Sequence, residues 1–202
     1  NRCLVLTHKY YDGIVPEMGE LTDYDNSVLK ELALIPSKVS HAIDSYRFRE
    51  AQAEAMNLAR LGNKYLADTE PWKLIKTAPD RVKTIMNIAL QITATLTIAF
   101  EPFLPFTSNK LTEILGISLL KWDAAGQSNL MNAGHIINKP ELLFSKIENE
   151  VIEKQIAKLE AATQANNKFP PMKDEVTFDD FSKMDIRVGQ VMTAEKVEKA
   201  DK

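Results

Sequence analysis

Trp72 is the side chain of this sequence that is best placed for chemistry with a partner. It follows Pro71 and stands among Lys64, Lys73 and Lys76. An aromatic ring held rigidly beside cationic side chains can stack on an unpaired nucleic-acid base, a contact worth about 1–3 kcal/mol. A lone tryptophan can equally anchor a helix corner from within the core, with its indole N–H bonded to a nearby acceptor. The residues alone leave both interpretations open.

The residues before Trp72 predict a sharp corner between two helical segments. A proline disfavours helical geometry in the residue before it, so Glu70 should lie at or beyond the end of a helix. Thr69 is then expected to act as a cap, with Pro71 in the first turn of the following segment. Such a corner would hold Trp72 on stiff backbone instead of on a flexible loop.

The remaining reactive side chains are scattered along the sequence. His8, His41 and His135 are far apart and Cys3 is the only cysteine, so the ligand spacing of a zinc site is missing. The sequence also lacks a phosphate-binding glycine loop and the common hydrolase and metalloprotease motifs. We therefore predict no catalytic residue, no metal site and no cofactor in this chain. Each histidine should lie at the surface or cap a helix.

Composition indicates an ordinary globular protein. The chain has 202 residues, of which 45% are hydrophobic and 26% are charged. Its net charge of −3 excludes a basic protein that coats DNA but allows a local basic patch. A single cysteine suits a reducing compartment, so we expect a cytoplasmic protein. The sequence begins without methionine and ends without closing a structural element, so we expect it to be a piece of a longer protein.

Apolar residues at spacings of three and four predict the helices that must position the corner. The first helix should cover residues 1–11 and end at Gly13, which can adopt a left-handed conformation. The second should begin at a capping box formed by Thr22 and Asp25. Pro36 should interrupt this second helix, because proline removes a backbone hydrogen bond.

Two longer helices should follow and meet at the corner. The first of them is expected to start at a Ser45 cap, and the second at another capping box, Thr77 and Asp80. The second is apolar around nearly its whole circumference, which is typical of a helix at the centre of a bundle. Its uncharged run at 84–100 is too polar and slightly short for a membrane span, so we expect a buried helix and no membrane association.

Three further elements and two changes in composition complete the chain. The elements are a shorter helix from Leu104-Pro105 to Gly116, an irregular region at 117–145 with a short extended piece at 136–138, and a last helix at about 145–163. Residues 164–176 are polar with a proline pair and predict a linker. Alternating apolar residues at 186–191 predict a strand. We therefore divide the chain into a bundle (1–163), a linker (164–176) and the truncated start of a β domain (177–202), which is too short for its own core.

Several motifs together resemble one protein family. They are N-K-Y at 63–65 with P-W-K at 71–73, Arg2 ahead of K-Y-Y-D-G at 9–13, and F-D-D-F at 178–181 with D-I-R-V-G at 185–189. The first two resemble the anticodon-binding domain of methionyl-tRNA synthetase, and the third resembles the start of the OB-fold tRNA-binding module appended to many bacterial members. The resemblance implies an all-α fold: the anticodon-binding helical bundle of class I aminoacyl-tRNA synthetases, with a linker and a truncated OB-fold start.

The resemblance also implies a role for individual residues. In this family the tryptophan that matches Trp72 stacks on the first anticodon base, a cytosine, and an asparagine and an arginine of the first helix bond to that base. By position the arginine corresponds to Arg2, whereas the asparagine falls before residue 1. The resemblance further implies anticodon contacts by three residues of the corner, Asn63, Asp68 and Pro71. Two lysines, Lys64 and Lys73, are expected to contact the phosphate backbone.

The parent enzyme implied by the resemblance joins methionine to its tRNA with ATP. ATP with magnesium and a zinc ion belong to its catalytic part, which this chain lacks. The implied partner is a methionine-accepting tRNA with a CAU anticodon. The full-length protein is expected to form a homodimer through the C-terminal module, whereas this chain alone should be a monomer.

Two alternatives remain open at this point. One is the anticodon-binding domain of another class I synthetase, such as the leucine, isoleucine or cysteine enzyme. The other is a helical protein-interaction module without an RNA role, which predicts an exposed apolar groove and no basic field near Trp72. The tRNA interpretation instead predicts that Arg2, Lys64 and Trp72 converge on one exposed face.

Overall fold

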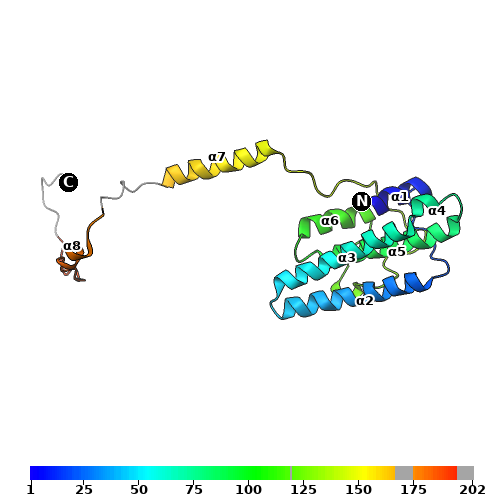
Figure 1. Ribbon diagram of the computed structural model, residues 1–202, viewed down its shortest axis with the longest axis horizontal. Helices are drawn as coiled ribbons and strands as arrows, with labels where there is room; N and C mark the ends of the chain where they lie inside the picture. Colours follow the sequence, from blue (N-terminus) through cyan, green and yellow to red (C-terminus); the bar gives the residue numbers. More distant parts are fainter. Residues whose placement is uncertain (119, 167–174, 195–202) are drawn as a thin grey trace. The chain divides into compact units, whose positions relative to one another are not determined.

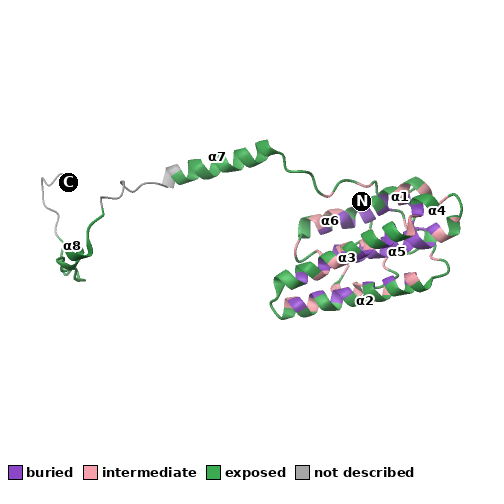
Figure 2. Ribbon diagram, viewed as in Figure 1, coloured by how far each residue is buried: buried purple, intermediate pink, exposed green. Residues whose placement is uncertain are grey.

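A computed structural model describes residues 1–118, 120–166 and 175–194. The chain divides into two compact units, Asn1–Lys146 and Ile147–Lys202 (Figure 1). The predicted bundle ended at residue 163, whereas this division falls at Lys146. Every side chain described between 147 and 163 is exposed (Figure 2).

The first unit is a helical bundle, which agrees with the predicted fold class. Its elements are α1 (Arg2–Tyr11), α2 (Asp23–Asp44), α3 (Phe48–Thr69), α4 (Pro71–Leu74), α5 (Pro79–Ala99), α6 (Pro105–Leu115) and the short 3₁₀ helix η1 (Trp122–Ala124). Helices α2 and α3 pack along each other, and α3 packs on α5 (Figure 1). Helix α5 also contacts α1, α2, α4, α6 and η1, so it forms the centre of the bundle.

Helix α5 is buried along most of its length, as its apolar circumference predicts. Ile85, Met86 and Leu90 are inaccessible to solvent. By length and composition alone this helix could cross a membrane, but 83% of the relevant segment is buried inside the protein. The helix is therefore the core of the bundle, and its apolar residues are used for packing.

The capping box at the start of α2 forms as predicted. The backbone N–H of Thr22 donates to Asp25 Oδ2 at 2.8 Å, and the backbone N–H of Asp25 donates to Thr22 Oγ1 at 3.3 Å. Pro36 lies inside α2, which continues past it to Asp44. Proline has no N–H to offer the carbonyl four residues earlier, and the backbone of Gly126 approaches that Leu32 carbonyl from outside the helix.

Gly126 should tolerate alanine less well than Gly134 does. Both have a φ of +83°, which costs a non-glycine residue about 1–2 kcal/mol. A Cβ at Gly126 would also lie 3.0 Å from backbone atoms of Leu32 and Ala33, whereas a Cβ at Gly134 meets nothing within 4 Å. We expect Gly126→Ala to lower the free energy of unfolding by about 1–3 kcal/mol more than Gly134→Ala, measured by urea titration. Equal losses would show that Gly126 does not pack closely on α2.

The caps predicted for α3 and α5 are both wrong. Ser45 ends α2 instead of starting α3, because Tyr46 turns to a φ of 59° and the N–H of Arg47 bonds to the carbonyl of Ala42. Helix α3 accordingly starts only at Phe48. Thr77 does not cap α5 either: its hydroxyl points back to the carbonyl of Leu74, and α5 begins at Pro79 without a side-chain cap. In both cases the candidate cap is part of the turn that ends the preceding helix.

The irregular region after α6 is fastened to the bundle by histidines and one bridge. Helix α6 ends at Gly116, which has a φ of +66°, and His135 Nε2 lies 2.7 Å from the carbonyl oxygen of Leu115. His8 Nε2 lies 2.9 Å from the carbonyl oxygen of Asn138. In the predicted extended piece, Ile136 pairs with Ile14 in a single antiparallel bridge. These contacts hold residues 132–138 against the ends of α1 and α6.

The second unit contains α7 (Asn149–Asn166) and α8 (Phe178–Ser182). Helix α7 extends into the predicted linker 164–176, of which residues 167–174 lie outside the described part. The strand predicted at 186–191 is not formed: residues 184–194 have no regular structure, and the end of the predicted β segment lies outside the described residues. A strand needs a neighbouring strand to satisfy its backbone groups, and residues 175–194 show no such pairing.

Candidate nucleic-acid interface

The corner that carries Trp72 is built around Glu70. Helix α3 ends at Thr69, Glu70 has a φ of 42° and a ψ of 55°, and Pro71 opens α4. Pro71 keeps Glu70 out of the right-handed helical region, and the left-handed conformation then turns the chain sharply. Thr69 is not the predicted cap, because its hydroxyl donates back to the carbonyl of Tyr65 at 2.6 Å. An ion pair of 2.8 Å between Glu70 and Lys73 bridges the corner.

Trp72 lies at the surface with part of its ring accessible. Its exposed fraction is 37%, and it is not one of the buried core residues among the described part of the chain. The guanidinium carbon of Arg2 lies 5.7 Å from the centroid of the Trp72 ring, which is a cation–π contact. The fold therefore brings Arg2 and Trp72 together, although helices α1 to α3 separate them along the chain.

Arg2 also shares a small cavity with Asn63. The cavity has a volume of about 160 Å³, and its lining comes from α1, α3, α5, α6 and two residues outside these helices, Asn1 and Leu143; it includes Arg2 and Asn63. Arg2 thus borders the same cavity as Asn63 and also contacts the ring of Trp72. This arrangement places an aromatic face, a planar cation and a side-chain amide in one region, which matches the face and edge of a single nucleobase.

The other predicted site residues differ in their exposure and in their partners. Lys64 is exposed beside Asn63, and Lys73 is exposed but paired with Glu70. Pro71 is buried, so it shapes the corner without a free surface of its own. Asp68 is exposed, yet one of its carboxylate oxygens already accepts a hydrogen bond of 2.6 Å from the hydroxyl of Tyr24. Asp68 is therefore engaged by Tyr24 of α2.

A buried carboxylate beneath this region is a feature that the sequence analysis missed. Asp25, expected only to cap α2, is fully buried. It accepts hydrogen bonds from both terminal nitrogens of Arg81, at 2.6 and 2.8 Å, and from the hydroxyl of Tyr65 at 2.6 Å. These partners lie 56 and 40 residues away in the sequence, so no local pattern could have indicated them.

The charge of Asp25 is stabilised in place. Burial by itself raises the pKa of this carboxyl, but the hydrogen bonds from Arg81, Tyr65 and Thr22 outweigh it and hold the pKa well below its usual range. Burial and the hydrogen bond to Asp25 in turn raise the pKa of Tyr65 far above its usual value. Asp25 is thus an ionised carboxylate with a complete set of donors at neutral pH.

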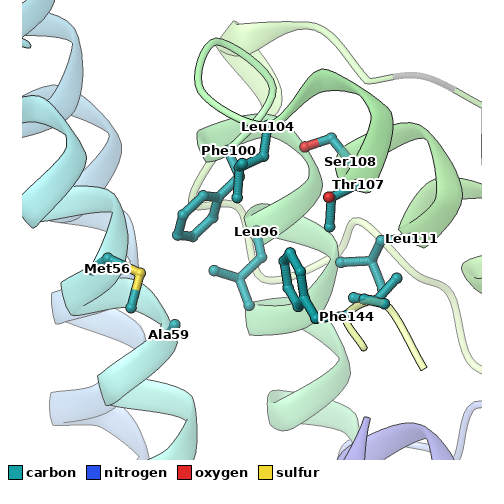
Figure 3. A pocket seen from close by; sticks show the side chains of 10 residues that line it. Met56, Ala59, Leu96, Phe100, Leu104, Thr107, Ser108, Leu111 and Phe144 are labelled. Atoms are coloured by element: carbon teal, nitrogen blue, oxygen red, sulfur yellow. The ribbon is translucent and has the colours of Figure 1, made fainter. Parts of the chain in front are cut away.

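An apolar cavity in the first unit lies next to the cavity that Arg2 and Asn63 border. Its volume is about 240 Å³, and its lining comes from α3, α5, α6 and the segment at 143–144 (Figure 3). The labelled side chains in Figure 3 are apolar except for Thr107 and Ser108. Such a cavity accepts hydrocarbon groups and offers little to a phosphate or to the polar edge of a base. Part of its lining, including Leu96 and Leu111, also borders the smaller cavity next to Arg2.

No metal centre is formed by the residues that the structure describes. Among them, no three histidine, cysteine, aspartate or glutamate side chains lie close enough to hold one ion. His8 and His135 are engaged with backbone carbonyls, and Cys3 is buried.

Comparison with known proteins identifies the family to which the chain belongs. The family model described as the anticodon binding domain of methionyl tRNA ligase matches residues 15–164. A methionine–tRNA ligase of Parabacteroides distasonis is 57% identical over an alignment that covers 100% of this chain and 30% of that protein. The corresponding ligase of Bacteroides fragilis is 54% identical with the same coverage. The chain therefore spans about 30% of the length of these curated relatives.

Solved structures show the same fold. The crystal structure of the free-state Mycobacterium tuberculosis methionyl-tRNA synthetase matches with a TM-score of 0.61. The match covers 73% of this chain and 30% of that one, at 22% sequence identity. The complex of that enzyme with methionyl-adenylate matches with a TM-score of 0.60. At this identity the likeness establishes the arrangement of helices.

Proposed function

Because the chain belongs to the family of anticodon-binding domains of methionyl-tRNA ligase, we propose that its bundle binds the anticodon of a methionine-accepting tRNA. The contact of Arg2 with Trp72, at 5.7 Å from the ring centroid, is the observation that carries the proposal. It brings a partly exposed aromatic face and a planar hydrogen-bond donor to one place on the surface. Together they can hold one unpaired base by its face and by its edge.

Cytosine fits this arrangement as the first anticodon base. Its ring can stack on Trp72, and its O2 acceptor can receive a hydrogen bond from the guanidinium of Arg2. The side-chain amide of Asn63, which borders the same cavity as Arg2, can meet the donor and acceptor groups of a base edge. Lys64 and Lys73 provide positive charge for the phosphates beside the anticodon, and Glu70 offsets part of the charge of Lys73.

The whole enzyme of which this domain is part is proposed to attach methionine to its tRNA using ATP. ATP with magnesium and the zinc ion are assigned to the remaining part of that enzyme, outside this chain. We further propose a homodimer of the full-length protein through the C-terminal module, a monomer for this chain alone, and a cytoplasmic location.

Binding of this chain to tRNA carrying a CAU anticodon tests the proposal. The matched control is the same tRNA with only the first anticodon base changed, at the same fixed salt concentration, because phosphate contacts alone bind any sequence. We expect the CAU tRNA to bind about tenfold more tightly or better, since losing one base contact costs about 1–3 kcal/mol. The readout is fluorescence anisotropy of end-labelled tRNA.

Two results would count against base reading by this chain. Equal affinity for both tRNAs at several salt concentrations would leave only phosphate binding. No measurable binding of either tRNA would remove the RNA role from the bundle as it stands and would favour the protein-interaction alternative. A version extended before residue 1 then decides whether the asparagine expected there is needed for the pocket.

A further inference from the structure

The first turn of α2 holds both ends of the segment that carries Trp72. This segment runs from Tyr65, near the end of α3, to Arg81, in the first turn of α5. Tyr24 and Asp25 are adjacent in α2, and their side chains contact three residues of the segment. Tyr24 and Asp25 therefore contact residues both before and after the corner.

Tyr24 contacts the end of α3, just before the corner. Its hydroxyl donates to Asp68 Oδ2 at 2.6 Å, and its ring lies 5.8 Å from the ring of Tyr65, centroid to centroid. Burial and the hydrogen bond to Asp68 raise the pKa of Tyr24 to about 12, so the hydroxyl remains a donor at neutral pH. The end of α3 is thus attached to α2 by a hydrogen bond to a charged acceptor.

Asp25 links the end of α3, before the corner, to the start of α5, after it. One of its oxygens accepts from Tyr65 and both accept from Arg81, at 2.6 to 2.8 Å. Thr22 adds two further donors to Asp25, each at 2.8 Å. A two-pronged guanidinium–carboxylate contact fixes orientation as well as distance. The start of α5 is therefore fixed relative to the end of α3.

The corner itself is short, although α4 packs on α5 and Pro71 is buried. Helix α4 has only four residues, and Glu70 before it is in the left-handed region. An ion pair of Glu70 with Lys73, whose side chains are 42% and 66% exposed, also bridges the corner. Exposed ion pairs contribute little, so the position of Trp72 depends on the packing of α4 on α5, on Arg2 and on the helix ends on either side of it.

We propose that Tyr24 and Asp25 are positioning residues for Trp72, and that Asp68 serves the site through Tyr24 and not by touching RNA. The part that concerns RNA rests on the anticodon-binding function proposed above, whereas the positioning of the ring stands on the contacts alone. Asp68 offers its carboxylate to α2, and a carboxylate turned toward an RNA phosphate would repel it. The assignment of Asp68 thus moves from the base pocket to its support.

Fluorine NMR of the chain labelled with 5-fluorotryptophan tests the positioning directly. The sequence has two tryptophans, Trp72 and Trp122, so the spectrum contains two resonances, which Trp72→Phe assigns. Tyr24→Phe removes only the hydroxyl and should shift or broaden the Trp72 resonance while that of Trp122 stays in place. Tyr46→Phe is the matched control, because the Tyr46 ring is 83% exposed at the other end of α2.

Binding of the CAU tRNA and its base-changed control completes the test. With Tyr24→Phe the preference for CAU should fall about two- to tenfold, the effect of one lost hydrogen bond, and the midpoint of thermal unfolding should stay near that of the Tyr46→Phe control. Asp68→Asn keeps an oxygen that accepts from Tyr24, so it should leave the Trp72 resonance and the preference nearly unchanged. Asp68→Ala should reproduce the effect of Tyr24→Phe.

The outcomes separate this inference from the proposed function. An unchanged Trp72 resonance in Tyr24→Phe overturns the positioning role. A loss of tRNA affinity in Asp68→Asn with an unchanged Trp72 resonance overturns the indirect role of Asp68 and gives it a direct contact. If the unaltered chain shows no preference between the tRNAs, the proposed function fails, while a displaced Trp72 resonance still supports the positioning of the ring by Tyr24.

Discussion

Replacing Asp25 with alanine should lower the free energy of unfolding by about 3–5 kcal/mol at neutral pH. The substitution leaves Arg81 without its partner, and the Arg81 side chain is only 25% exposed. It also leaves the hydroxyl of Tyr65, a fully buried residue, without its acceptor. Because Asp25 joins the starts of α2 and α5 to the end of α3, the loss should appear in one cooperative transition.

Urea unfolding followed by circular dichroism measures this change, with Asp23→Ala as the matched control. Asp23 lies in the same first turn of α2 but is exposed, so its loss removes only a favourable interaction with the helix dipole, about 0.3–1 kcal/mol. If Asp25→Ala cost no more than Asp23→Ala, the buried network would contribute nothing beyond helix capping.

The same carboxylate predicts how stability depends on pH. The pKa of Asp25 in the folded chain lies below its ordinary value of 3.8, since the hydrogen bonds from Arg81, Tyr65 and Thr22 outweigh the effect of burial. A lowered pKa contributes stability that is complete above the ordinary value and is lost as pH falls below it. The stability difference between the unaltered chain and Asp25→Asn should therefore be constant from pH 7 to about 5 and shrink below about pH 4.

The bundle could be predicted because its signals are local. Apolar spacing located α1, α2, α3, α5 and α6, Pro71 located α4, and the Thr22–Asp25 box located the start of α2. The resemblance to the methionyl-tRNA synthetase family is confirmed by the family model and by relatives at 54–57% identity. The caps predicted at Ser45 and Thr77 were wrong, because both residues belong to the turns that end the preceding helices.

The candidate site could be predicted only in part. Trp72 stands out by its own sequence context, but its contact with Arg2 depends on the packing of α1 against the bundle, and Arg2 was identified through the family resemblance. The contacts of Asp25 with Tyr65 and Arg81 bridge 40 and 56 residues, and a pattern read along the chain carries no information on such pairs. The assignment of Asp68 to the base pocket stays a prediction, and its bond to Tyr24 argues for the indirect role.

Replacing Trp72 with alanine should weaken binding of the CAU tRNA by about 1–3 kcal/mol, which is roughly 5- to 150-fold in the dissociation constant. The stacking face disappears and Arg2 loses the ring that holds its guanidinium in place. The preference for CAU over the base-changed tRNA should fall with it, because phosphate contacts are unaffected by this change. Anisotropy titrations of both tRNAs at one salt concentration provide the measurement.

Thermal or urea unfolding of the same variant separates stacking from core packing. Removing a fully buried tryptophan costs about 3–5 kcal/mol of stability, whereas Trp72 is 37% exposed and should cost clearly less. Phe106→Ala is the control for loss of an exposed aromatic ring, since Phe106 is 88% exposed on α6, and it should leave tRNA affinity unchanged. A stability loss of 3–5 kcal/mol in Trp72→Ala, with unchanged preference for CAU in the protein that remains folded, would assign Trp72 to the support of the corner and leave base reading to other residues.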